Sequence, residues 1–192
     1  MKCYQMRFRT FLWCIVSLSL TSCAYKVPTT TKQIDSTKIA DTNQINPRPP
    51  LPNYANRLPK KITTSEKVVL VDPRVHAWGA YTANGELVRA GLATAGSSWC
   101  SDIKRACRTK PGSFRIQSLG NANCKSSIYP LPRGGAPMPY CMFFNKNQGL
   151  HGSYNVVEGN VSHGCVRLRV HDAEWLRFQF VKMGTKVIVK PY

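Results

Sequence analysis

From residue 66 to the end of the chain, short apolar runs alternate with turn-forming residues, a pattern typical of a mostly β domain. The segments with the length and composition of strands are 67–72, 75–81, 86–94, 113–117, 141–145 and 185–190. Asn84-Gly85 lies between the second and third of these, where the dipeptide predicts a hairpin turn.

One segment near the C-terminus has helical spacing instead. The predicted helix begins at His171 or Asp172, and apolar residues recur along it through Leu176 to Met183. Gly184 is placed to end it. The side chain of Asp172 is suited to cap the first turn. The pattern therefore predicts a mostly β fold with one main α-helix near the C-terminus.

The first 22 residues have the order of a secretory signal, with basic residues before a short apolar run. That run is shorter than the roughly 20 apolar residues of a membrane span. It ends in Leu20-Thr21-Ser22-Cys23, which resembles a bacterial lipobox and implies a lipid on Cys23 after cleavage. Ala24 favours the outer membrane of a Gram-negative bacterium. The alternative is an ordinary signal in which Cys23 is incidental.

Residues 23–65 are rich in Thr, Pro, Asn and Lys and contain few large apolar side chains. Such a composition predicts a disordered linker, here lipidated at its start, that spans roughly 35 to 130 Å. We therefore expect a signal peptide at 1–22, a linker at 23–65 and a single domain at 66–192.

The chain is strongly basic, with a formal net charge of +18 from 27 basic and 9 acidic residues. Removing the signal, with Lys2, Arg7 and Arg9, lowers this charge by three to +15. Nucleic acid is the usual partner of such a surplus, but export excludes it and leaves wall carboxylates and lipid phosphates. A basic surface without a specific partner is the alternative.

Cysteine usage agrees with export. Beyond the signal and Cys23, four cysteines suggest two disulfides in an oxidising compartment. Of the three possible pairings we expect Cys100 with Cys107 and Cys124 with Cys141, and a structural zinc site is the alternative. Cys165 remains as the odd thiol.

The densest chemistry lies at 150–153, Leu-His-Gly-Ser, and at 162–168, Ser-His-Gly-Cys-Val-Arg-Leu. A neighbouring imidazole can lower the pKa of a thiol from about 8.5 to roughly 3.5–7.5 and produce a thiolate nucleophile. His151 and His163 are the candidate bases for Cys165. A zinc site of these three residues lacks a fourth ligand. A papain-like protease is disfavoured because both histidines precede the cysteine.

These segments, with Met-Pro-Tyr-Cys-Met-Phe-Phe at 138–144 and Asp-x-x-Trp-Leu at 172–176, resemble the L,D-transpeptidase catalytic domain, also called YkuD. Residues 108–114 are similar to the family's Thr-Pro-x-Gly-x-Phe segment, with the proline one position late. The resemblance covers about 66–192 and implies a compact, β-sandwich-like domain. The extra cysteines further resemble a subset labelled enhanced-entry proteins.

The resemblance implies that Cys165 is the nucleophile and His151 the general base, on adjoining strands, with the Gly152 carbonyl fixing the imidazole tautomer. His163, two residues before Cys165 on an extended segment, would share its face and support it, or replace His151 as the base. Gly164 allows close backbone approach, and its amide is a candidate oxyanion donor beside that of Cys165.

Four further residues complete the expected site as substrate-binding groups. Arg167 is suited to clamp a carboxylate, and Ser162 to hold the loop by hydrogen bonding. Gly152 and Tyr140 are expected to line the cleft. No metal or organic cofactor is implied.

The implied reaction is acyl transfer on peptidoglycan stem peptides, with release of D-alanine from a tetrapeptide. The acceptor is a second stem (a 3→3 cross-link), a lipoprotein lysine, a D-amino acid or water, the last being carboxypeptidase activity. Carbapenems should acylate the same sulfur, and we expect a monomeric catalytic domain. His151 and Cys165 are only 14 positions apart, fewer than is usual in the family. A catalytically degenerate lipoprotein that binds the cell wall or takes part in surface interactions is therefore the alternative.

Overall fold

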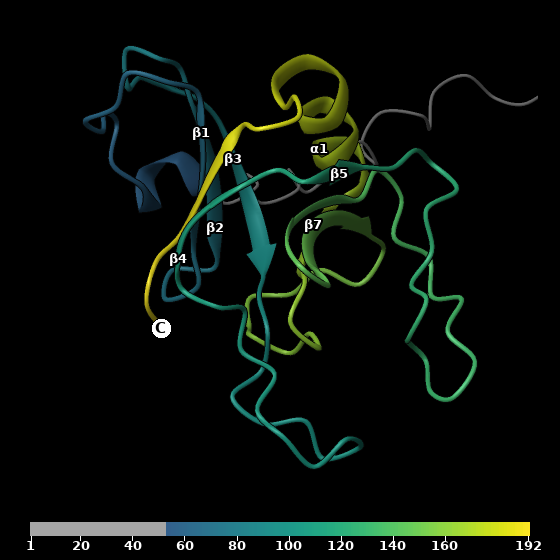
Figure 1. Ribbon diagram of the computed structural model, residues 1–192. Helices are drawn as coiled ribbons and strands as arrows, with labels where there is room; N and C mark the ends of the chain where they lie inside the picture. Colours follow the sequence, from purple (N-terminus) through teal and green to yellow (C-terminus); the bar gives the residue numbers. More distant parts are fainter. Residues whose placement is uncertain (1–52) are drawn as a thin grey trace, which may run out of the picture. The chain divides into compact units, whose positions relative to one another are not determined.

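The computed structural model describes residues 53–192, and the strands of this part form one sheet (Figure 1). They are β1 (Val68–Asp72), β2 (Ala77–Tyr81), β3 (Leu87–Thr94), β4 (Gly112–Arg115), β5 (Ser118–Leu119), β6 (Met142–Asn145), β7 (Gln148–Ser153), β8 (Val166–Arg169) and β9 (Lys186–Val189). The helical elements are a 3-10 turn η1 (Tyr54–Arg57), the helix α1 (Val170–Trp175) and a π-helical turn η2 (Leu176–Phe180). The expected signal peptide and Cys23 lie outside the described residues.

The sheet order is β4-β9-β1-β2-β3-β8-β7-β6-β5. The pairs β1–β9 and β7–β8 are parallel, and the other neighbours are antiparallel. The sheet is curled, because Phe114 of β4 and Phe144 of β6, near its opposite ends, meet with ring centroids 5.4 Å apart. The predicted fold, mostly β with one main helix near the C-terminus, is confirmed.

Strand β1 is buried on both faces, which explains its unbroken apolar run. Because side chains alternate along a strand, Val69 and Val71 belong to the main core inside the curl, and Val68 and Leu70 belong to a second cluster. The helix covers the main core through Leu176.

The domain begins before residue 66, where the sequence placed the end of the linker. Tyr54 and Leu58 are each only 6% exposed and belong to the second apolar cluster. The Ile62 amide donates to the Gly85 carbonyl at 2.9 Å. Residues 53–65 therefore pack on the sheet, because two apolar side chains four positions apart anchor an otherwise polar segment.

The C-terminal helix differs from its prediction at both ends. It begins at Val170, and Asp172 caps nothing; this carboxylate is buried and accepts a hydrogen bond from Arg89 at 2.8 Å. The helix widens into η2 and ends at Phe180, short of Met183. This wide turn brings Phe180 into the main core.

The predicted hairpin at Asn84-Gly85 is present. Gly85 has φ +80° and donates to the Thr82 carbonyl at 3.0 Å, closing the turn between β2 and β3. A side chain at Gly85 would also collide with the Ile62 carbonyl oxygen, 1.8 Å from the position of a Cβ.

Two long excursions leave the sheet, the segments at 97–110 and 120–140 (Figure 1). Cys100–Cys107 closes the first and Cys124–Cys141 the second, which is the pairing expected from the sequence. These bonds remove the alternative of a zinc site built from the four cysteines. In the part of the chain that the structure describes, no helix has the length and apolar character to cross a bilayer.

Candidate active site

The pairing of β7 with β8 places the two motif segments beside each other. The strands run parallel, with Leu150 opposite Val166 and His151 opposite Arg167. Cys165 immediately precedes β8, so the histidine and the thiol belong to neighbouring segments, as predicted. Because strand pairing fixes both ends, the short connection between them does not separate base from nucleophile.

His151 is buried, and its ring is held in one tautomer. Its Nδ1 lies 2.8 Å from the Gly152 carbonyl oxygen. Since a carbonyl only accepts, Nδ1 must carry the proton, which leaves Nε2 with a free lone pair. Burial lowers the pKa of His151 to about 4, and the charge of Arg167 adds to this effect, although the bond to Gly152 opposes it. The ring is therefore neutral and able to accept a proton at pH 7.

Cys165 is the free thiol among the described residues. Its Sγ donates to the Asn147 carbonyl at 3.4 Å. Burial raises the pKa of the thiol, although a backbone hydrogen bond from Gly149 and the charge of Arg167 lower it. The sequence predicted a depressed thiol pKa and a standing thiolate; the structure gives the opposite shift. The resting pair is a neutral thiol and a neutral imidazole.

The turn before Cys165 is braced by Ser162, as expected. Its hydroxyl donates to the Cys165 carbonyl and accepts from the Gly164 amide at 3.1 Å. The Thr109 hydroxyl donates to the Gly164 carbonyl at 2.8 Å, and it also accepts from the Gly96 amide. Cys165, the candidate nucleophile, therefore lies on a turn whose polar groups are hydrogen-bonded to neighbouring residues.

Gly164 is required by its backbone, with φ +121°, a conformation that side chains rarely adopt. The predicted oxyanion role of its amide is not supported, because that amide already donates to Ser162. Of the two amides considered, the one of Cys165 is the remaining candidate donor.

His163 does not share a face with Cys165 along an extended strand, because the left-handed backbone of Gly164 interrupts the alternation. Its Nε2 lies 2.7 Å from Asp102 Oδ2, and its ring packs on Tyr129 with centroids 4.4 Å apart. The contacts of His163 hold a loop in place, whereas Nε2 of His151 has no hydrogen-bond partner among the described residues. The geometry favours His151 as the base.

Cys100, Asp102 and His163 have potential ligand atoms within 4.8 Å of one another. Cys100 is bonded to Cys107, so in this state its sulfur is not a free nucleophile or metal ligand. Among the described residues, the zinc site suggested for His151, His163 and Cys165 is not assembled. Cys165 thus remains the candidate nucleophile.

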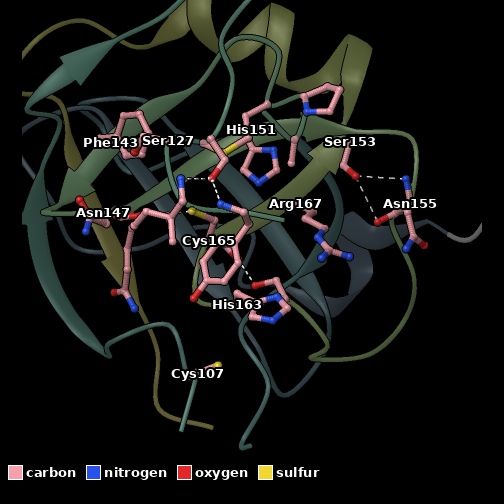
Figure 2. A pocket seen from close by; sticks show the side chains of 18 of the residues that line it. Cys107, Ser127, Phe143, Asn147, His151, Ser153, Asn155, His163, Cys165 and Arg167 are labelled. Atoms are coloured by element: carbon pink, nitrogen blue, oxygen red, sulfur yellow. Dashed lines mark hydrogen bonds between the residues drawn. The ribbon is translucent and has the colours of Figure 1, made fainter. Parts of the chain in front are cut away.

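His151, His163, Cys165 and Arg167 gather around a cavity of about 580 Å³ (Figure 2). Both disulfide-closed loops contribute to its walls. Its lining also includes Arg105, Arg108, Tyr129, Met138, Asn147 and Asn155. Arginines line it and carboxylates do not, so the cavity is suited to an anionic substrate.

Two residues expected to bind substrate lie elsewhere. Tyr140 is absent from the cavity lining; its hydroxyl donates to Glu174 at 2.8 Å, and its ring contacts Phe178. Gly152 is buried behind His151 and positions that ring. A positive φ of 58° at Tyr140 directs its side chain toward α1 and leaves Met138 in the cleft.

Sequence reasoning missed several residues of the site. Thr109 lies in the segment that resembled a family motif, so a signal for it existed. Asp102 and Tyr129 had none, because only the folded loops bring them to His163. The Asn147 carbonyl is a backbone contact that residue type does not reveal.

Residues 66–189 match the family model of the YkuD L,D-transpeptidase catalytic domain. The chain belongs to this family. The resemblance stated from the motifs is thus confirmed at the level of the YkuD domain. L,D-transpeptidases act on peptidoglycan stem peptides. No curated protein matches the chain in sequence.

Solved structures of YkuD proteins share the fold. An L,D-transpeptidase from Xylanimonas cellulosilytica is 24% identical, with a TM-score of 0.59, over 69% of this chain and 64% of the other. One from Mycobacterium tuberculosis is 20% identical, with a TM-score of 0.53, over 65% and 57%. One from Mycobacterium smegmatis is 22% identical, with a TM-score of 0.54, over 66% and 59%. The chain thus spans less than two thirds of these structures.

Proposed function

We propose that this YkuD protein is a peptidoglycan L,D-transpeptidase whose nucleophile is Cys165 and whose general base is His151. The observation that carries the proposal is the free lone pair on His151 Nε2, produced by the hydrogen bond from Nδ1 to Gly152. This base and a free thiol border the same cavity. General-base catalysis requires a neutral imidazole within reach of the proton it removes.

Because the resting thiol is protonated, proton transfer must accompany attack. His151 Nε2 takes the proton as Sγ bonds to the carbonyl carbon between the stem's third residue and its terminal D-alanine. The tetrahedral intermediate collapses, the carbon–nitrogen bond breaks, and D-alanine leaves with the proton from His151. A thioester on Cys165 remains. The amide of Cys165 is the candidate donor to the oxyanion.

An amine then attacks the thioester, loses its proton to His151 and releases the Cys165 thiol. The amine belongs to a second stem, a lipoprotein lysine or a D-amino acid, and water in its place gives a shortened stem. No ATP is consumed, since the thioester conserves the energy of the cleaved peptide bond. Arg167, on the cavity wall, is placed to hold a substrate carboxylate.

The test is incubation of the protein with purified tetrapeptide muropeptides, followed by mass spectrometry. We expect cross-linked dimers, exchanged stems or tripeptides, and loss of all three in Cys165→Ala. A carbapenem should add its mass to the peptide containing residue 165 in the wild type. Absence of products and adduct in the folded wild type would reject the enzymatic proposal and favour a wall-binding lipoprotein.

We further propose that the protein is an exported lipoprotein of the enhanced-entry subset, anchored at the outer membrane through Cys23 and acting there as a monomer. Two disulfides suit an oxidising compartment. Mass spectrometry of the mature N-terminus is the test. A lipidated cysteine at position 23 is the expected result, and an unmodified N-terminus would reject the anchor.

A further inference from the structure

The segment at 97–110, which the Cys100–Cys107 disulfide closes, contributes two arginines, Arg105 and Arg108, to the cavity that holds Cys165. Both side chains are exposed, and neither has a carboxylate partner among the described residues. Neither guanidinium charge is therefore neutralised by an ion pair, unlike the charge of Arg115, which pairs with Glu66 at 2.8 Å. Two unpaired guanidinium groups on one cavity wall attract anions.

The loop that carries these arginines is held at several points. The Cys100 amide donates to the Arg105 carbonyl at 2.9 Å, and the Cys107 amide donates to the Ser97 carbonyl at 3.2 Å. The guanidinium of Arg108 lies 5.2 Å from the centre of the Tyr192 ring. A fixed loop loses less entropy when it binds a ligand, so the backbone that carries the two arginines is pre-organised.

From this geometry we propose that Arg105 and Arg108 form a carboxylate-binding subsite that positions an anionic substrate over Cys165. The subsite lies on the disulfide-closed loop and is distinct from Arg167, which lies on β8. It rests on the proposed function only for the identity of the ligand, a carboxylate of the donor peptide. Guanidinium groups bind carboxylates through paired hydrogen bonds, so the subsite selects charge and geometry together.

Two small reagents of similar shape test the subsite without any peptidoglycan. Iodoacetate and iodoacetamide alkylate a thiol with loss of iodide, and they differ in whether a carboxylate or an amide adjoins the reacting carbon. The full chain is treated with each, and the rate is followed by mass spectrometry of the peptide containing Cys165. The ratio of the iodoacetate rate to the iodoacetamide rate reports how the cavity treats negative charge.

We expect Arg105→Gln and Arg108→Gln each to lower this ratio by about two- to fivefold, as for exposed charge pairs, and the double variant to lower it further. Salt at about 0.5 M should lower the wild-type ratio. Arg74→Gln is the matched control, because Arg74 is exposed and does not line the cavity. The iodoacetamide rate checks the fold, since unfolding would change the rate with the neutral reagent.

An unchanged ratio in the double variant would overturn the subsite, and so would an equal fall in Arg74→Gln, which would indicate a general effect of net charge. With muropeptide donors, the double variant should raise KM more than it lowers kcat. The two proposals fail separately. If the ratio falls in the double variant as expected but the wild type does not turn over muropeptides, the result counts against the proposed function alone. If the wild type turns over muropeptides but the ratio is the same in the double variant, the result counts against the subsite alone.

Discussion

At the scale of single residues, the proposed base and the proposed nucleophile are both neutral at rest. An imidazolium–thiolate pair requires a raised histidine pKa and a lowered cysteine pKa. Here the pKa of His151 is lowered and that of Cys165 is raised, and burial is the largest cause of both shifts. Separating charge between two buried groups is costly without a substrate to accept the sulfur. The thiol therefore becomes nucleophilic only while a carbonyl carbon is bonding to it.

The pH dependence of acylation should reveal this arrangement. His151 acts as a base only when neutral, and its pKa is lowered to about 4. We therefore expect kcat/KM for acylation by a carbapenem to stay high below pH 6 and to fall only near pH 4. Stopped-flow rates between pH 3.5 and 8 measure this, and His151→Gln should lose the rate across the range. A wild-type acid limb centred near pH 6.5 would contradict the assignment.

At the scale of elements, His163 joins the two disulfide-closed loops. It hydrogen-bonds Asp102 on the first loop and packs against Tyr129 on the second. Both loops line the cavity, so this contact sets the spacing of its walls. The short connection after β7 adds Asn155 to the cavity lining.

Asp102→Asn should weaken the link without disturbing the chemistry. The carboxylate is exposed, and its bond to His163 holds the pKa of Asp102 below its usual range. We expect KM for the donor to rise by up to about fivefold, with kcat within about twofold of the wild type. Steady-state kinetics with muropeptides measure this. Glu86→Gln is the charge control, and a large fall in kcat in Asp102→Asn would instead assign a chemical role.

The sequence predicted the parts of the site that depend on local pattern. The strand at Val68–Asp72 and the meeting of His151 and Cys165 at one cavity could be read from apolar runs and one motif. The path of the loops could not, because it depends on backbone angles such as the positive φ of Tyr140, which turned that side chain away from the cleft. The amide of Gly164 was misjudged for a similar reason, since only the folded turn places Ser162 against it.

At the scale of the whole molecule, the described domain is larger than the family match. The match begins at residue 66, yet residues 53–65 pack on the sheet. Tyr54 and Leu58 pack in the second apolar cluster, which lies outside the main core, and η1 contacts β2 and β3. The segment between the proposed anchor and the family domain therefore contains part of the fold.

A chain that begins at residue 66 should be less stable than one that begins at residue 53. Loss of Tyr54 and Leu58 removes two buried side chains, each contributing roughly 1.5–3 kcal/mol, and exposes Leu70. We expect the free energy of unfolding to fall by about 3–6 kcal/mol, measured by guanidinium denaturation. The substitution Lys60→Ala in the longer chain is the control, because the Lys60 side chain is exposed. Equal stability of the two chains would show that 53–65 adds nothing.

The protonated state of Cys165 also bears on how long the protein survives. Peroxide converts thiolates, far more readily than thiols, to sulfenic acid and then to forms that are not recovered. Since burial keeps the pKa of Cys165 raised, its sulfur is shielded from such damage between turnovers. In the proposed mechanism, the raised pKa that keeps the Cys165 thiol protonated until substrate binds thus also slows its loss to oxidants.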